Sequence, residues 1–240
     1  MVAKIRNDFF KVWTPDMAYV LGYWWADGNM LQATSGKRVS FTSKDGYYLE
    51  QIARVIGVGR VTPKGVKYYE LAIKRADMYN DLLQLGGTPR KSLSANWHAP
   101  PSDILRHFVR GFIDGDGSLY WISTVITTMP RLEANGTHAF LTGMALAIQD
   151  ATGIPVPKCN GYENIWKMVW TGMYAKCLAA WLYEDCDLCL ERKRTIALEF
   201  FQWQPKLYRR NHITPKMRKF FGHHLPEQPL TQSTELQETI

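Results

Sequence analysis

A duplicated segment constrains the fold of this chain more than any other feature of its sequence. Val20-Leu-Gly-Tyr-Trp-Trp-Ala-Asp27-Gly28 returns 89 residues later as Val109-Arg-Gly-Phe-Ile-Asp-Gly-Asp116-Gly117. Two further pairs keep the same order at slightly larger offsets: Gly57 with Gly153, and Lys91 with Lys193. A repeat that keeps its order along a chain indicates two copies of one structural unit. The growing offset predicts longer loops in the second copy.

Both copies have the residue patterns of an α-β-β-α-β-β-α unit. In the first copy, Thr14-Pro15-Asp16 is typical of a helix start, and the helix should run to about Asp27. We expect strands at 30–34 and 38–43, a helix at 45–56, strands on both sides of Lys64-Gly65, and a helix at 76–85. In the second copy, Ser102 should cap a helix that ends at Asp116. We expect strands at 119–123 and 138–141, a helix at 144–151, a turn at Asn160-Gly161, a strand at 166–170, and helices at 173–183 and 190–203.

The resulting organisation has two subdomains. We expect an N-terminal arm at 1–13, a first subdomain at 14–91, a linker at 92–101, a second subdomain at 102–225, and a disordered acidic tail at 226–240. The hydrophobic share of 46% and the charged share of 21% are ordinary for a globular chain. No apolar run is long enough for a membrane span, and the first residues are unlike a signal peptide. An intracellular soluble protein is expected, and cytoplasm and organelle both stay open.

The charge of the chain indicates a polyanionic partner. Lys and Arg number 29 against 22 Asp and Glu, which gives a net charge of +7. The tail from Pro226 holds three glutamates and no Lys or Arg, so the body carries +10. Such an excess favours nucleic acid first and an acidic membrane surface second. Four cysteines are too few for a disulfide framework, and Cys186 and Cys189 are expected to be buried thiols.

Small residues lie on one face of each repeated helix. Ala18 and Gly22 in the first helix, and Gly111 in the second, would let the two backbones approach closely. Helices packed in this way bring Asp27 and Asp116 together at one end. A carboxylate at a helix C-terminus is disfavoured by about 0.3–1 kcal/mol, and two neighbouring carboxylates repel each other. A divalent cation such as Mg²⁺ relieves both penalties, so the pattern indicates metal-assisted hydrolysis of a phosphodiester.

The two segments resemble the motif pair of LAGLIDADG homing endonucleases of the single-chain type. Phe112-Ile-Asp-Gly-Asp-Gly-Ser118 is a close match. Tyr23-Trp-Trp-Ala-Asp-Gly-Asn29 is looser, because Trp25 stands where the family name has its first Asp. The segment from Leu182 to Arg194 resembles the family's closing segment. The resemblance covers roughly residues 14 to 205.

The resemblance implies a pseudo-twofold α/β (α+β) fold in which two four-stranded antiparallel sheets form a saddle over DNA. The two repeated helices would form the domain interface, at Ala18, Gly22 and Gly111. The implied metal site, for Mg²⁺ or Mn²⁺, consists of Asp27, Asp116, Ala26 and Gly115. Lys91 and Lys193 match the basic residue expected near each site, which would position or polarise the attacking water.

The resemblance also implies the partner and the reaction. Family members cut both strands of a long, asymmetric DNA site, leave short 3′ overhangs, and promote the mobility of a host intron or intein. We expect a monomer, with intron RNA as a further candidate partner and no membrane partner. Basic and polar side chains on or beside the strands would contact the DNA: Lys37, Arg38, Ser40, Thr42, Lys44, Lys64, Lys67, Lys74, Arg75, Arg131, Lys158 and Lys167.

Two other classes of function remain open from the sequence. One is a maturase or transcription regulator that has the same fold but has lost cleavage. Loss of either Asp27 or Asp116 would favour it, and both are present. The other is a basic protein that binds RNA or a membrane surface and has no catalytic role. Metal-dependent cutting of duplex DNA separates the nuclease from both.

Overall fold

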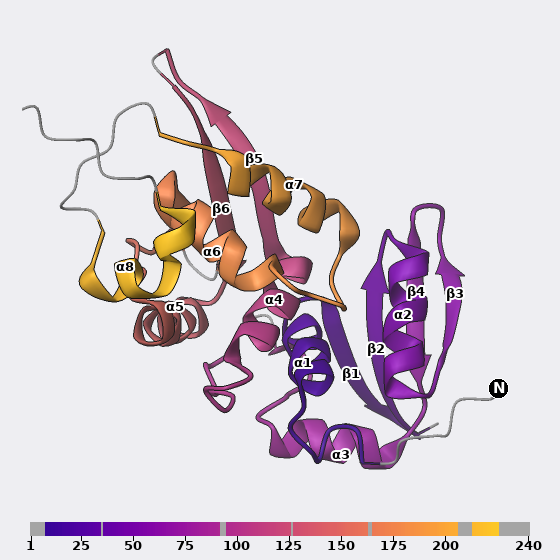
Figure 1. Cartoon of the computed structure of the whole chain (residues 1–240). Coiled ribbons are helices and arrows are strands. Elements are labelled where there is room, and N and C mark those ends of the chain that lie inside the picture. Colours follow the sequence, from indigo (N-terminus) through magenta and orange to yellow (C-terminus); the bar gives the residue numbers. More distant parts are fainter. Residues whose placement is uncertain are drawn as a thin grey trace, which may run out of the picture.

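Two similar α/β units lie side by side in the computed structural model (Figure 1). It describes residues 8–34, 36–91, 95–125, 127–162, 165–205 and 213–225. The predicted tail at 226–240 and most of the N-terminal arm lie outside these residues. The predicted subdomain boundaries stay predictions.

The first unit consists of three helices and one four-stranded antiparallel sheet. Its elements are α1 (Pro15–Asp27), β1 (Gly28–Ala33), β2 (Gly36–Ser43), α2 (Gly46–Ile56), β3 (Arg60–Lys64), β4 (Tyr68–Ile73) and α3 (Ala76–Gln84). The strand order is β1-β2-β4-β3. Thr14 caps α1 by accepting a hydrogen bond from the Met17 amide at 3.1 Å, as the sequence predicts.

The second unit repeats this order and extends it. Its elements are α4 (Leu105–Asp116), β5 (Gly117–Ser123), β6 (Thr128–Gly136), α5 (His138–Thr152), β7 (Asn160–Tyr162), β8 (Ile165–Thr171) and α6 (Met173–Tyr183). The strand order β5-β6-β8-β7 matches that of the first sheet. Three elements follow: α7 (Glu191–Gln202), α8 (Pro215–Phe221) and the short 3₁₀ helix η3 (Gly222–His224). The predicted α+β class with two antiparallel sheets is therefore confirmed.

Three predictions about the second unit are wrong. Residues 138–141 begin helix α5 instead of forming a strand, because the Thr137 hydroxyl accepts a hydrogen bond from the Phe140 amide and starts the helix. Asn160 and Gly161 belong to strand β7 instead of a turn. The Ser102 side chain does not cap α4, which begins only at Leu105.

The strand that the sequence analysis missed is β6, which contains a proline. Pro130 pairs with Trp121 of β5, whereas pairing with β8 begins one residue later, at Arg131. Pro130 therefore lies where β6 has a strand on one side only, which is where a strand tolerates proline.

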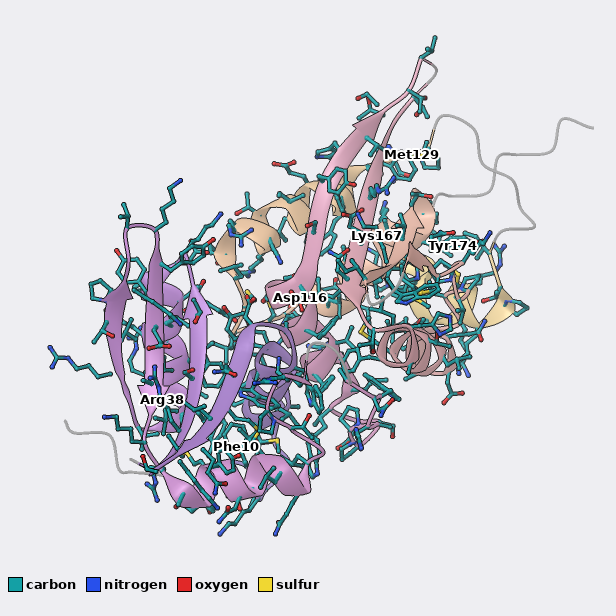
Figure 2. All side chains as sticks on the ribbon, turned by 180° about the vertical axis from the view of Figure 1, so that it is seen from behind. Phe10, Arg38, Asp116, Met129, Lys167 and Tyr174 are labelled. Carbon is teal, nitrogen blue, oxygen red and sulfur yellow. The ribbon has the colours of Figure 1, made fainter. Side chains whose placement is uncertain are left out.

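Each sheet has one face covered by helices and one open face. In Figure 1 the helices α2, α6 and α7 stand in front of the sheets, and the view from behind in Figure 2 looks onto the strands. Val39 and Phe41 of β2, and Leu132 and Ala134 of β6, are fully buried on the covered side. Because side chains alternate along a strand, Arg38, Thr42 and Arg131 belong to the open faces.

The two units meet where α1 packs against α4. A methyl group on Gly22 would lie 2.0 Å from the carbonyl oxygen of Phe108, and one on Gly111 would lie 2.0 Å from that of Tyr19. Both distances are far inside van der Waals contact, so the helix backbones touch each other directly. Ala18 is also completely buried. No helix among the described residues has the length and apolar character of a membrane span.

Replacing Gly111 should destabilise the protein. In Gly111→Ala the new methyl group meets backbone, which cannot rotate away, and we expect a loss of about 1–3 kcal/mol in the free energy of unfolding. Urea unfolding measures the loss. Gly222→Ala is the matched control, because a methyl group there meets nothing within 4 Å. Equal stability of the two variants would contradict the close contact of α1 and α4.

Candidate active site at the ends of α1 and α4

Two carboxylates lie together where α1 and α4 end. Asp27 is the last residue of α1 and Asp116 is the last residue of α4. A methyl group on Gly115 would lie 2.2 Å from Ala26 Cβ and 3.5 Å from Asp27 Oδ2, so the end of α4 touches Asp27. The close helix contact therefore brings the two carboxylates to one place, between the two sheets (Figure 2).

Lys91 and Lys193 lie at this place in the same relation to their own repeat. The Lys91 ammonium donates hydrogen bonds to the carbonyl oxygens of Trp25 at 2.8 Å and Ala26 at 3.1 Å. The Lys193 ammonium donates to three carbonyl oxygens, those of Ile113 at 2.6 Å, Asp114 at 2.8 Å and Gly117 at 2.7 Å. Each lysine thus satisfies carbonyl groups at a helix end that would otherwise lack partners. Both side chains are buried, at 3% exposure.

The two lysines differ in the number of ammonium N–H groups that make hydrogen bonds to carbonyl oxygens. An ammonium has three N–H donors, and Lys193 uses three on the end of α4. Lys91 uses two among the described residues and also lies over the Trp24 ring, 5.1 Å from its centroid, so one of its N–H groups has no hydrogen bond to a carbonyl oxygen. The predicted role of both lysines toward water stays a prediction, and the geometry favours Lys91 for it.

Burial shifts the pKa values of all four groups of this cluster, and the neighbouring charges modify these shifts. Burial, followed by repulsion from Asp27, raises the pKa of Asp116 to about 6. Burial also raises the pKa of Asp27, and the two lysine charges oppose that rise. The pKa of Lys91 and that of Lys193 both fall to about 8, because burial penalises their charged forms. The carboxylates are therefore harder to ionise without a further cation nearby.

A cavity of about 350 Å³ adjoins the carboxylates. Asp27, Asp116, Asn135 and Thr137 contribute polar groups to its wall, and Trp25 and Phe140 contribute rings. The ionisable groups in this wall are the carboxylates of Asp27 and Asp116. Carboxylate oxygens are the donor type that Mg²⁺ and Mn²⁺ prefer. Desolvated, mutually repelling carboxylates beside an open space fit a hard divalent cation. Two further residues were predicted at the metal site. The Ala26 carbonyl oxygen accepts a hydrogen bond from Lys91, and Gly115 lies against Asp27.

The sequence analysis gave no role to Asp114, which the structure makes the most deeply bound acid of the motif. Asp114 is 1% exposed. It accepts hydrogen bonds from the Tyr19 and Tyr183 hydroxyls at 2.7 Å each and from the Leu190 amide at 2.8 Å. Burial raises its pKa, while Lys193 and these donors oppose the rise. The sequence contains one indication of this role: Asp114 is an acidic residue in a helix that is expected to be buried at the domain interface.

Asp114 connects three parts of the molecule. Tyr19 is on α1, Tyr183 ends α6, and Leu190 precedes the helix that carries Lys193. In the first unit the corresponding position holds Trp25, which packs on Phe140 and His98 instead. The two halves therefore differ in the residues that surround each carboxylate, although Asp27 and Asp116 occupy equivalent positions in the repeat.

Five of the twelve predicted DNA-contacting residues lie on exposed surface. Lys44, Lys64, Lys67, Lys74 and Lys158 are exposed. Three differ from the prediction in orientation, surroundings or exposure. Lys37 donates to Asn80 Oδ1 at 2.6 Å and lies over the ring of Tyr79, so it packs on α3 at the covered side. Arg75 is paired locally with Asp77 at the start of α3, and Ser40 is only 4% exposed.

A glutamate lies between basic residues on each open sheet face, which the sequence analysis also missed. Glu70 pairs with Arg38 and, at 2.9 Å, with Lys64, which also approaches the Thr42 hydroxyl. Glu133 pairs with Arg131 at 3.2 Å and with Lys167 at 3.0 Å. Figure 2 shows Arg38 and Lys167 on the two sheets, on either side of Asp116. The pairs hold the basic side chains in place before any partner binds.

The fold is that of LAGLIDADG meganucleases. The chain is similar to the LAGLIDADG meganuclease I-AabMI bound to uncleaved DNA, with a TM-score of 0.57, 11% identity, and coverage of 78% of this chain and 89% of that one. It is also similar to the LAGLIDADG homing endonuclease I-SmaMI bound to cleaved DNA (TM-score 0.54, 13% identity, 89% and 96% covered). No protein-family model and no curated protein sequence matches the chain. The likeness therefore lies in the fold and not in overall sequence.

The raised pKa of Asp116 predicts a stability effect that depends on pH. A carboxyl group whose pKa rises on folding costs stability once it ionises, so the cost is absent below about pH 4 and complete above about pH 6. In chelator, Asp116→Asn should therefore be more stable than the parent by about 1–2 kcal/mol at pH 7.5, and equal to it at pH 4. Urea unfolding at both pH values measures this. The exposed Asp103→Asn is the control, and an equal gain at both pH values would contradict the assignment.

Proposed function

We propose that this chain is a DNA endonuclease that cuts both strands of a duplex target, with Asp27 and Asp116 as its metal-binding residues. The supporting observation is the meeting of these two carboxylates at the crossing ends of α1 and α4, between two open sheet faces that carry basic residues. The likeness of the fold to DNA-bound meganucleases supports the same reading.

Asp27 and Asp116 would hold Mg²⁺ or Mn²⁺. When bound, the cation supplies Lewis-acid stabilisation of negative charge on the scissile phosphate. The charges of the two lysines oppose the rise that burial causes in the pKa of both acids. Lys193 acts as a positioning residue that fixes the end of α4, and Lys91 has a donor left for the attacking water. Asp114 holds the α4 end against α1 and α6.

The open faces of the two sheets would hold the DNA. A long target is expected because the two sheets extend on both sides of Asp116 (Figure 2). An asymmetric target is expected because the units differ: β5 and β6 span 7 and 9 residues, against 6 and 8 for β1 and β2. We further propose that the protein acts as a monomer, leaves short 3′ overhangs, and promotes the mobility of a host intron or intein.

Cleavage should require both carboxylates and a divalent cation. The test selects cut molecules from a randomised duplex library and sequences their ends, with Mg²⁺, Ca²⁺ or excess chelator. Mg²⁺ should support cutting, and Ca²⁺ should support binding with little cutting. Asp27→Asn and Asp116→Asn should each lower the cutting rate by at least about 100-fold while binding persists.

Two outcomes would contradict the nuclease. Cutting in excess chelator, or by Asp116→Asn at the parent rate, would remove the role of the carboxylates. Enrichment of bound but never cut sequences with Mg²⁺ would identify a binding protein of the same fold, such as a maturase or regulator.

The two faces of the first sheet should respond differently to loss of a lysine. Each phosphate contact contributes about −0.9 to the slope of log affinity against log salt. Lys64→Gln removes a charge from the open face and should flatten the slope by about one unit without changing site preference. Lys37→Gln removes the same charge from the covered side and should leave the slope unchanged. Equal slopes for both variants would place the DNA elsewhere.

A further inference from the structure

A second group of possible metal ligands lies away from the two carboxylates. Glu184 follows the last residue of α6, and His223 and His224 belong to η3, about 40 residues later in the chain. His224 Nε2 lies 3.1 Å from Glu184 Oε2, and His223 Nε2 lies 3.8 Å from the same atom. One ligand atom from each of the three residues lies within 4.8 Å of the other two.

These separations suit one small cation with tetrahedral geometry. Zinc binds imidazole nitrogen and carboxylate oxygen at about 2.0–2.2 Å. Two ligands of a tetrahedral zinc therefore lie about 3.3–3.5 Å apart. The measured 3.1 and 3.8 Å lie on either side of that range, so slight side-chain rotation would seat the ion.

Of the three side chains, that of His224 is held most firmly by the surrounding fold. The His224 side chain is 10% exposed, and its ring packs on Phe201 of α7 with the centroids 5.6 Å apart. The α8 segment that precedes η3 is anchored by buried Met217 and Phe221. Arg106 reaches the backbone carbonyl of Glu184 instead of its carboxylate. Among the described residues, the ion pairs of that carboxylate are with the two histidines alone.

We propose that Glu184, His223 and His224 form a zinc site, with water as the fourth ligand. Two imidazoles and one carboxylate favour Zn²⁺ over Mg²⁺, whereas the oxygen ligands of Asp27 and Asp116 favour the reverse. The site is therefore distinct from the proposed catalytic one in its residues and in the cation that it favours. A metal there would tie the C-terminal segment 213–225 to the end of α6, which precedes the loop that supplies the Leu190 amide to Asp114.

Zinc titration of the full chain tests this site. The protein is purified without a polyhistidine tag, stripped with chelator and titrated with Zn²⁺ by calorimetry, and Co²⁺ absorption reports the coordination geometry. We expect one equivalent of Zn²⁺, a tetrahedral Co²⁺ spectrum and a higher Tm in zinc. His223→Ala should weaken Zn²⁺ binding at least about tenfold, because even residues that only orient ligands have effects of that size. Glu184→Gln should do the same.

Controls separate this site from others. His223 has 64% of its side chain exposed, so His223→Ala should fold, and circular dichroism without metal verifies it. Asp116→Asn removes a carboxylate of the other site and should leave the single zinc equivalent in place. His138→Ala removes another exposed histidine and should also have no effect. Unchanged zinc affinity in His223→Ala and Glu184→Gln would overturn the proposal, as would loss of the zinc equivalent in Asp116→Asn.

Discussion

The direct backbone contact between α1 and α4 is the constraint on which the rest of the structure depends. Neither Gly22 nor Gly111 has room for a methyl group, because each faces a carbonyl oxygen of the other helix. At ordinary helix spacing the ends of the two helices would separate, and Asp27 would no longer lie against Gly115. The same contact fixes the distance between the two sheets, since each helix runs directly into a strand, β1 or β5. The close approach of α1 and α4 thus sets both the domain interface and the position of the two carboxylates.

That contact creates an electrostatic problem that the surrounding residues largely balance. Two acids at helix ends meet in a desolvated place, and two buried lysines offset their charge. The lysines contribute chiefly as hydrogen-bond donors to the carbonyl groups of the helix ends. The remaining cost, visible in the raised pKa of Asp116, is what a cation would relieve. A site of this kind is pre-organised for a positive ion and is less stable without one.

The sequence predicted the elements with strong local signals and missed those that depend on tertiary pairing. Helices with a clear start signal, such as α1 with its Thr14 cap, lie where the sequence predicts them. Strand β6 was missed because Pro130 is unfavourable in a strand unless its neighbour on one side is absent, which only the sheet register shows. The repeat identifies Asp27, Asp116, Lys91 and Lys193, because residues at equivalent positions of two repeats occupy equivalent places in the two units. No matching position in the repeat identifies Asp114, Glu70 or Glu133. Lys37 lies on the same side of β2 as the buried Val39 and Phe41, so the alternation along the strand already indicates the covered face.

The hydrogen bond between Asp114 and Tyr19 makes the two halves of the chain different at their contact. In the repeat, the position that matches Tyr19 holds Phe108, and the position that matches Asp114 holds Trp25. A symmetric pair of second units would place Asp114 opposite a phenyl ring and remove one of its two hydroxyl donors, which leaves Tyr183 and the Leu190 amide. A symmetric pair of first units would set tryptophan against tyrosine and lose the carboxylate altogether. The two halves are therefore complementary at this contact, and a symmetric dimer of either half would lack the hydrogen bond between Tyr19 and Asp114.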